Sequence, residues 1–359
     1  MIDPVDISVV VQGPITGRPD DPVAKRLTYQ TLESVHRHLP GCEIIVSTWR
    51  GSNTHDLPPF HRLVESDDPG GWPCDLPPGT VVTSSAPRLL YNANRQIVSS
   101  LAGLQAATRP YAMKLRSDMV LTGTGFIDWF GRYRARCPER RILRERVLAC
   151  TIYSRNPRKK YNYPFHPSDW FHFGLREDVL NLWDIPLAPE PETSRWLDSR
   201  PRPENDPEQW PTYRYTVEQY NWLTFLRKHG DLVFDYKTDD RPSIVALSEL
   251  TLANNLVFGE PTQFNIKFIK YPITADAWLT VYTHGDWLRL YRRYCDPTVR
   301  YGPDLVVWHK RASAAQRFFL NYWWQLDLGP RLRRVSPLAF RVAKRLHTMI
   351  FSSDNPLRG

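Results

Sequence analysis

Polar side chains follow predicted strands at three places near the start of the chain. These places are Gln12-Gly13-Pro14, Thr48-Trp49-Arg50 and Arg116-Ser117-Asp118. Because ligands of open α/β sheets bind beyond the carboxyl ends of the strands, we expect the three segments to meet in one crevice. Glycine at position 13 would let the backbone approach a ligand closely. Taken alone, the Gly-Pro pair is best explained as the end of a strand. A ligand site is favoured because several strand ends are expected to converge.

Asp118 is the member of this group with the clearest chemistry. A carboxylate that follows a buried strand can hold a divalent cation against a diphosphate, because Mg²⁺ and Mn²⁺ prefer hard oxygen ligands. Lys114 and Arg116 lie close to it in the sequence and could neutralise the phosphates as a leaving group gains charge. The alternative is that Asp118 caps a turn, where aspartate is common.

A second candidate for binding a nucleotide is the first turn of the helix predicted over residues 92–107. Arg95 in this turn can meet a diphosphate, and Asn94 can hydrogen-bond a base or a ribose. In the alternative interpretation neither residue contacts a ligand: Asn92 caps the helix and Arg95 is exposed to solvent. The sequence favours neither interpretation.

The hydrophobic pattern predicts the elements that position these residues. Ile7–Val11 is typical of a strand buried on both faces, Leu27–His38 of an amphipathic helix, and Glu43–Thr48 of the next strand. A strand, a helix and a strand in this order form a βαβ unit, which implies a parallel sheet with a right-handed crossover. We further predict strands over 81–83, 111–115 and 147–153, helices over 92–107, 126–133, 176–183 and 217–228, and loops over 50–80, 155–168 and 186–213.

The composition favours a folded protein with an anionic partner. The chain has 359 residues, a formal net charge of +9, 13% aromatic residues and 32 prolines. This charge suits phosphorylated ligands, nucleic acid or a lipid surface, and the many prolines indicate long shaped loops. The five cysteines are scattered and form no CxxC pair. We therefore expect neither a disulfide framework nor a structural zinc site. The cysteines also favour a reducing compartment.

We expect a cytoplasmic protein without a spanning segment. The N-terminus lacks the basic and apolar regions of a signal peptide. No stretch of the sequence approaches the roughly 20 apolar residues that a spanning helix needs.

The end of the chain, residues 311–359, is expected to contact an anionic membrane surface. Every charged residue from Arg331 to Arg345 is basic, and apolar residues recur among them at near-helical spacing. A basic amphipathic helix of this kind suits anionic lipids. The alternative is a helix that packs on the rest of the protein and exposes a solvated basic face. Pro337 argues against one continuous helix.

Five segments of the sequence carry a resemblance to a known family. They are Gln12-Gly13-Pro14, Asn94-Arg95-Gln96, Lys114-Leu115-Arg116-Ser117-Asp118, Ser168-Asp169-Trp170-Phe171-His172-Phe173-Gly174 and Glu218-Gln219-Tyr220. In this order they resemble the WavE-like family of bacterial lipopolysaccharide and surface-polysaccharide synthesis proteins. The resemblance covers most of residues 5–310, and the segment from Ser168 to Gly174 is its most specific part.

The resemblance implies an α/β fold of the GT-A type, a Rossmann-type mixed sheet flanked by helices, with a C-terminal helical extension. It implies that the protein moves a sugar from a nucleotide-sugar donor to a growing lipopolysaccharide or capsule-type glycan. We expect a glycosyltransferase domain over residues 1–310. Its donor half would be about 1–125 and its acceptor half about 126–310.

The resemblance also places Asp118 at the metal-binding residue of the GT-A "DxD" element. The sequence departs from that element, because Arg116 stands where the first carboxylate would be. Binding of Mn²⁺ or Mg²⁺ would then depend on Asp118 and a distant ligand, His284 or His309. Alternatively the metal is dispensable, and Arg116 supplies part of the positive charge.

An inverting transfer needs a carboxylate that takes the proton of the acceptor hydroxyl. Asp169 is one candidate, since the neighbouring Trp170 and two phenylalanines suit stacking on sugars and would raise its pKa by desolvation. Glu218 is the other, although a carboxylate in the first turn of a helix also stabilises that helix. Asp169 could equally cap a Phe-Gly turn. The choice stays open, as does that between inversion and retention.

Trp170 and His172 are the candidates for contacting the acceptor, with packing in the core as the alternative for each. Two other classes of protein remain as alternatives. A nucleic-acid-binding protein would explain the charge, but the sequence has no RNP, KH or helix-turn-helix signature. A nucleotidyltransferase would want a glycine-rich basic loop after the first strand, which Gly13-Pro14 is not. The expected partners are a nucleotide-sugar donor, a glycan or lipid-linked glycan acceptor and the inner face of the cytoplasmic membrane, with no nucleic acid.

Overall fold

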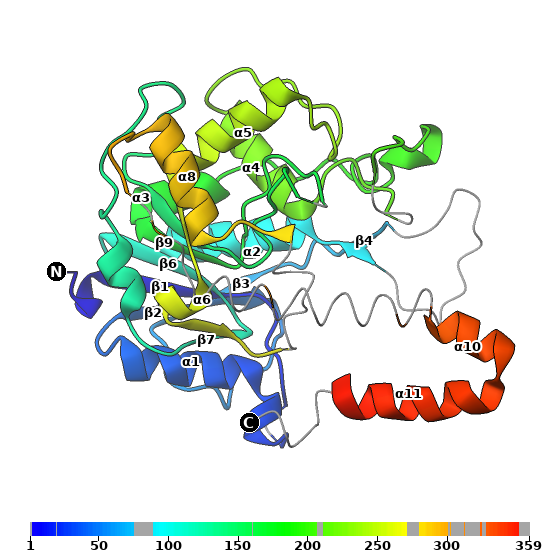
Figure 1. Ribbon diagram of the computed structural model, residues 1–359. Helices are drawn as coiled ribbons and strands as arrows, with labels where there is room; N and C mark the ends of the chain where they lie inside the picture. The colour runs from blue at the N-terminus through cyan, green and yellow to red at the C-terminus, as the bar shows by residue number, and fades with distance from the viewer. Residues whose placement is uncertain are drawn as a thin grey trace. The chain divides into compact units, whose positions relative to one another are not determined.

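The computed structural model (Figure 1) describes residues 2–18, 20–74, 89–159, 161–206, 211–270, 280–300, 302, 312, 324 and 328–351. The chain divides into two compact units. The first contains Met1–Pro272 and Thr280–Tyr301, and the second contains Ile273–Leu279 and Gly302–Gly359. The sheet and every candidate site residue that the structure describes lie in the first unit.

Seven strands of the first unit form one mixed sheet in the order β10-β8-β9-β6-β1-β2-β3. Strand β1 is central and pairs in parallel with β2 and β6, and β3 continues the parallel part beyond β2. Strand β9 is antiparallel to both of its neighbours, β6 and β8. The strands are β1 (Ile7–Gln12), β2 (Glu43–Trp49), β3 (Arg62–Ser66), β6 (Tyr111–Arg116), β8 (Val147–Cys150), β9 (Phe171–Leu175) and β10 (Leu256–Gly259).

Helices cover both faces of this sheet, which explains why β1 and β2 are continuous apolar runs. In Figure 1, α1 lies beneath the strands, and α3, α4 and α5 lie on the other side. The helices of the first unit are α1 (Leu27–His38), α2 (Ala93–Ala106), α3 (Arg176–Trp183), α4 (Val217–Arg227), α5 (Pro242–Asn255), α6 (Pro261–Phe264) and α8 (His284–Tyr294). Short elements complete it: η1 (Pro4–Asp6), η2 (Val23–Lys25), η3 (Gly125–Trp129), η4 (Trp196–Ser199), β4 (Trp72–Pro73), β5 (Leu90–Tyr91), β7 (Met119–Leu121) and β11 (Ile266–Phe268).

Helix α2 lies unusually close to the sheet because of a glycine in its middle. A Cβ atom at Gly103 would stand 2.4 Å from Val10 Cγ1 and 2.8 Å from Ser47 Cβ. Contacts this short are impossible, so a side chain at position 103 would push the helix away from β1 and β2. The close approach fixes the first turn of α2 beside the carboxyl ends of these strands.

The α/β class, the mixed sheet and the flanking helices agree with the sequence-based prediction, and α1 and α3 have the predicted bounds. Three predictions were wrong in part. The helix over 126–133 is only the short 3₁₀ helix η3, the strand from Val147 ends at Cys150, and the loop over 50–80 contains β3. Strand β3 is an edge strand with mostly exposed side chains, so it has no apolar run to reveal it. The strand predicted over 81–83 lies outside the described residues.

The Phe-Gly turn expected after Asp169 is instead part of a strand. Gly174 lies within β9 and pairs with Ala112 of β6. A Cβ atom at Gly174 would stand 3.1 Å from Val147 Cγ2, so the glycine accommodates close packing between strands rather than a turn. Asp169 therefore does not cap a turn at this position.

The second unit contains helices α10 (Gly329–Val335) and α11 (Pro337–Phe351). They are separated by Ser336, whose φ of −152° and ψ of 103° are extended, as expected from the following proline. Trp324 stacks on His347 and Phe340 of α11, with ring centroids 4.9 and 6.0 Å apart. Among the helices that the structure describes, none is both long enough and apolar enough to cross a membrane.

Candidate active site

Two cavities adjoin at the carboxyl ends of the parallel strands. We call the one of about 330 Å³ the strand-end cavity, since it is lined by the ends of β1 and β6, and the one of about 420 Å³ the aromatic cavity. Arg116, Asn92 and Gln96 line both of them. A ligand in one cavity would therefore lie next to a ligand in the other, across the Arg116 side chain.

The wall of the strand-end cavity is built from Gln12, Gly13, Pro14 and Ser117. Gly13 has a φ of +124°, and a Cβ atom there would lie 3.0 Å from Ser117 Oγ. The Ser117 hydroxyl donates to the carbonyl of Pro14 at 2.8 Å, and the amide of Gln12 donates to Ser99 Oγ at 2.6 Å. This backbone is held from several sides, and glycine is the residue that its conformation favours.

Basic side chains outnumber acidic ones around the strand-end cavity. Asp68 is one of its two acidic residues, and it accepts two hydrogen bonds from Arg95, at 2.6 and 2.7 Å. The second acidic residue, Asp118, is also paired with an arginine. The resulting excess of positive charge suits an anionic ligand such as a diphosphate. The basic residues are Arg95, Lys114, Arg116 and Lys270.

Asp118 is bonded to Arg116 through both of its carboxylate oxygens. Arg116 Nε and Nη2 donate to Oδ1 at 2.9 Å and to Oδ2 at 2.7 Å. The guanidinium also lies 4.4 Å from the centre of the Trp170 ring and 5.6 Å from that of Phe268. Asp118 thus orients Arg116, whose side chain remains 24% exposed toward the cavities.

The residues around Asp118 do not fit a divalent cation. Both of its oxygens already accept from a guanidinium, which a metal ion would have to displace. Within the part of the chain that the structure describes, no three His, Cys, Asp or Glu side chains are grouped so that they could hold a metal.

His284, the expected second metal ligand, is not brought to Asp118. Its Nδ1 lies 2.7 Å from the carbonyl of Phe258 and its Nε2 lies 3.1 Å from the hydroxyl of Tyr133. Its ring packs edge-on against Trp129, with centroids 4.5 Å apart. Both ring nitrogens are used in this cluster, which explains the histidine by packing. The other candidate, His309, lies outside the described residues.

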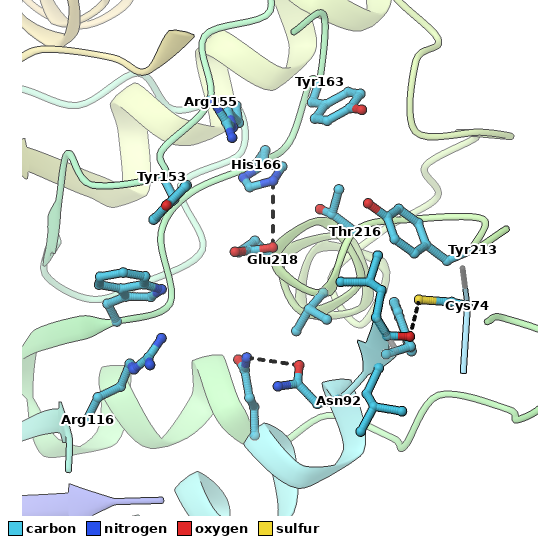
Figure 2. A pocket seen from close by; sticks show the side chains of 16 residues that line it. Cys74, Asn92, Arg116, Tyr153, Arg155, Tyr163, His166, Tyr213, Thr216 and Glu218 are labelled. Carbon is cyan, nitrogen blue, oxygen red and sulfur yellow. Dashed lines mark hydrogen bonds and ion pairs between the residues drawn. The ribbon is translucent and has the colours of Figure 1, made fainter. Parts of the chain in front are cut away.

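Glu218 projects into the aromatic cavity from the first turn of α4 (Figure 2). The turn is fixed by a capping box in which Thr216 accepts from the backbone amide of Gln219 and the Gln219 side chain accepts from that of Thr216. The carboxylate of Glu218 lies 3.6 Å from His166 Nε2. Figure 2 shows Arg116 and Asn92 approaching from the side of the strand ends. The aromatic residues of this cavity, which suit contact with sugar faces, are Tyr91, Tyr153, Tyr163, Trp170 and Tyr213.

Asp169, the other predicted base, lies behind the aromatic cavity and does not line it. Its side chain is buried and borders a small separate cavity, together with Glu218 and His172. Burial, and next the nearby negative charge of Glu218, raise the pKa of Asp169 to about 6. The two predicted carboxylates are therefore neighbours, but only Glu218 is open to the larger cavity.

Lys114 is fully buried beneath these groups. Its ammonium donates to the backbone carbonyl of Asp169 and lies 4.6 Å from the centre of the Trp183 ring. Burial lowers the pKa of Lys114 to about 8, against the opposing effect of the Asp169 charge. Lys114 also lines the strand-end cavity, so its charge can act on an anion bound there.

His172 holds the Asp169 segment and does not line the aromatic cavity. Trp183 Nε1 donates to His172 Nδ1 at 3.1 Å, which leaves His172 Nε2 to donate to the carbonyl of Ser168, also at 3.1 Å. Burial lowers the pKa of His172 to about 3, so the ring is neutral. Its surroundings thus give His172 a structural role. Trp170, the other predicted acceptor contact, does line the aromatic cavity.

Of the two residues predicted on the first turn of α2, only Arg95 lines the strand-end cavity. Asn94 instead exchanges two hydrogen bonds with the backbone of Ala188, at 2.7 and 3.1 Å, and holds the segment before α4. Asn92 and Gln96 line both cavities in its place. They are four residues apart and therefore share one face of the helix, and this spacing is visible in the sequence. His166 and Lys270 were missed because nothing in their local sequence connects them to the strand ends.

The sequence was compared with known proteins. A family model described as "WavE lipopolysaccharide synthesis" matches residues 7–323. No curated protein matches the sequence. The mixed sheet with helices on both faces is consistent with a Rossmann-like glycosyltransferase fold. Since the matched region includes the whole sheet and both cavities, the chain belongs to the WavE family of lipopolysaccharide synthesis proteins.

Proposed function

We propose that this protein is a glycosyltransferase that moves a sugar from a nucleotide-sugar donor to a hydroxyl of a lipopolysaccharide-type glycan. The observation that carries the proposal is the pair of adjoining cavities, one basic and one aromatic, with Arg116 as a common wall. A transferase must bring a charged donor and a neutral, hydroxyl-rich acceptor into contact, and these cavities offer the two environments side by side.

The donor diphosphate binds in the strand-end cavity. Arg116 and Lys114 face it from β6 and Arg95 from α2, while Gly13 allows close approach of the backbone. As the bond from the anomeric carbon to the phosphate oxygen breaks, the leaving nucleoside diphosphate gains negative charge. Fixed cationic side chains stabilise that charge more in the transition state than in the ground state. They act here without a divalent cation, because Arg116 occupies the oxygens of Asp118.

The acceptor binds in the aromatic cavity, with its hydroxyl at Glu218. Glu218 takes the hydroxyl proton as the acceptor oxygen bonds to the anomeric carbon on the face opposite the leaving group, which inverts the configuration. Trp170 and the tyrosines of the cavity contact the sugar rings. Asn92 and Gln96, which line both cavities, are placed to contact donor and acceptor alike.

The acceptor is lipid-linked, and helix α11 contacts the inner face of the cytoplasmic membrane. A stripe of exposed apolar residues supports this, with exposed fractions of 66% for Leu338 and 54% for both Val342 and Leu346. Arg341 and Arg345 follow the same one-turn spacing and are also exposed. Apolar residues beside basic ones fit a surface of anionic lipid.

The proposal is tested by incubating the protein with nucleotides and nucleotide sugars. Thermal denaturation is followed with UDP, GDP, CMP and their sugars, and any stabilising sugar is then supplied with lipopolysaccharide-core oligosaccharide or lipid-linked glycan. We expect one nucleotide to raise the melting temperature and its sugar to be transferred. No shift with any nucleotide, together with salt-sensitive RNA binding, would favour the nucleic-acid-binding alternative. Formation of a nucleotide sugar and pyrophosphate from a sugar phosphate and a nucleoside triphosphate would instead indicate a nucleotidyltransferase.

A further inference from the structure

A small cavity lies behind Glu218, on the side away from the aromatic cavity. We call it the rear cavity; its volume is about 20 Å³, and its walls include Asp169, Glu218, Asn221 and Trp222. The last three lie at positions i, i+3 and i+4 of α4 and thus share one face of the helix. A space of this size holds a single water molecule.

Five buried polar atoms at the rear cavity have no hydrogen-bond partner among the described residues. The atoms without a hydrogen bond are both carboxylate oxygens of Asp169, both polar atoms of the Asn221 amide and the indole nitrogen of Trp222. The three residues are only 4%, 8% and 3% exposed, respectively. Buried polar groups are rarely left without a partner, and several of them around one small space indicate a bound polar molecule.

The neighbouring side chains do not satisfy Asp169. The ammonium of Lys114 donates to its backbone carbonyl, and His172 uses both ring nitrogens on Ser168 and Trp183. The charged or titratable groups that act on the carboxylate are Glu218, Lys114, Arg116 and His166. Glu218 is the group of like charge, and it borders the same cavity. Both carboxyl groups therefore border the same small space.

We propose that the rear cavity holds one ordered water that joins the carboxyl groups of Asp169 and Glu218, with Asn221 and Trp222 as its further partners. The water takes hydrogen bonds from the amide and indole N–H groups and donates to one oxygen of each carboxylate, which supplies a partner for three of the five atoms described above. As pH falls, the first proton goes to Asp169, and at higher pH both groups are ionised. Asp169 is therefore a positioning residue whose negative charge makes Glu218 a stronger base. This role rests on the proposed function, but the water site itself does not.

The pH dependence of stability follows from this arrangement. Burial and the charge of Glu218 raise the pKa of Asp169 to about 6 from an ordinary value of 3.8. Between these two pH values the folded state binds a proton that the unfolded state has lost. The contribution of Asp169 to stability is therefore greatest at low pH and is lost as pH rises through about 6. His172 contributes in the opposite direction, because its pKa is lowered. The difference between wild type and an Asp169→Asn variant therefore isolates Asp169.

The experiment compares Asp169→Asn with wild type by urea unfolding between pH 4 and pH 8. We expect the stability of Asp169→Asn relative to wild type to increase as pH rises through about 6. A difference that does not change with pH would overturn the role of Asp169. This measurement needs no substrate, so its outcome is independent of whether the protein transfers a sugar.

Activity provides the second readout once a donor and an acceptor are known. Above pH 6, Asp169→Asn should lower kcat/KM by roughly threefold to tenfold, because Glu218 loses the neighbouring negative charge that makes it a stronger base. Below pH 6, where Asp169 of the wild type is neutral, the two proteins should agree. The KM for the acceptor should change little. An unchanged profile, with activity retained, would contradict the inference.

A third variant covers the case in which Asp169→Asn does not fold. Asn221→Leu fills the rear cavity and removes the amide partners of the water. It should lower kcat/KM above pH 6 as Asp169→Asn does, because the water no longer joins the two carboxyl groups. An atomic-resolution crystal structure of the wild type should show one water within hydrogen-bond distance of both Asp169 and Asn221. A dry cavity in that structure would overturn the inference.

Discussion

The carboxylate of Asp118 holds the guanidinium of Arg116 through two hydrogen bonds at the end of β6. One residue, Ser117, separates them in the sequence, and in the proposed function the pair stands in place of the two carboxylates of a DxD element. The arginine makes residue 116 positive where a DxD element has a negative residue, so the pair has no net negative charge. An anion such as a diphosphate can then be bound directly, whereas two carboxylates would need a cation between themselves and the phosphates.

Arg116→Ala should weaken binding of the donor nucleotide by roughly 10- to 100-fold, the loss expected for hydrogen bonds between charged groups. Arg116→Lys should give an intermediate result, since lysine keeps the charge but loses the planar fork. Isothermal titration calorimetry with the nucleoside diphosphate measures both. Arg241→Ala is a matched control, because Arg241 pairs with Asp239 at 2.6 and 2.7 Å on the exposed surface. Equal loss in the control would show that the effect is not local to the cavity.

Glu218→Gln should lower kcat by roughly 10²- to 10⁴-fold and leave donor binding unchanged, because the amide cannot take the acceptor proton. Steady-state kinetics with varied donor and acceptor separates the two effects. Glu177→Gln is the control, since Glu177 is the second residue of α3 as Glu218 is of α4, but it is exposed and lines neither cavity. Retention of more than a tenth of kcat by Glu218→Gln would remove Glu218 from its role as the base.

Gly13→Ala should destabilise the fold by about 1–3 kcal/mol, the range expected for a strained backbone position. Its φ of +124° disfavours any side chain, and the new methyl group would meet Ser117 Oγ at 3.0 Å. Urea unfolding measures the loss. Gly51→Ala should cost less, because φ there is +77° and nothing lies within 4 Å of the added atom. If Gly51→Ala were the more damaging change, the packing against Ser117 would not be the cause.

The tail gives a prediction that is independent of catalysis. Replacement of Leu338, Val342 and Leu346 by serine should reduce binding to vesicles containing anionic lipid, because these exposed side chains supply the apolar contact. Cosedimentation measures the bound fraction. Lys25→Ala is a control with an exposed basic residue in the first unit. Undiminished binding of the triple variant would exclude α11 as the membrane contact.

The sequence predicted the parts of the fold that local patterns specify. Strands β1, β2 and β6 are apolar runs, and α1 is strongly amphipathic, so each was placed within a residue or two. Strand β3 was missed because an edge strand needs no apolar run, and Gly174 was misinterpreted because a glycine can serve close packing as well as a turn. In both cases the structure is determined by contacts with residues that are distant in the sequence, which local patterns do not show.

The same distinction applies to the site. Gln12, Arg116 and Asp118 were predictable because strand ends meet at one edge of a sheet. His284 was not excluded by the sequence, since only the fold shows its ring nitrogens bonded to Phe258 and Tyr133. The neighbourhood of Asp169 and Glu218 likewise depends on how α4 packs against α2 and α3, which no local pattern specifies.

The most direct measurement is calorimetric titration of UDP, GDP and CMP into the wild-type protein in the presence of EDTA, repeated with Mn²⁺. The cationic residues of the strand-end cavity should bind one of these nucleotides in EDTA, with an affinity that Mn²⁺ improves by less than about threefold. Arg116→Ala should weaken that binding by roughly 10- to 100-fold. A nucleotide that binds only when Mn²⁺ is present would contradict the assignment of Arg116 to the diphosphate and return Asp118 to the role of a metal ligand.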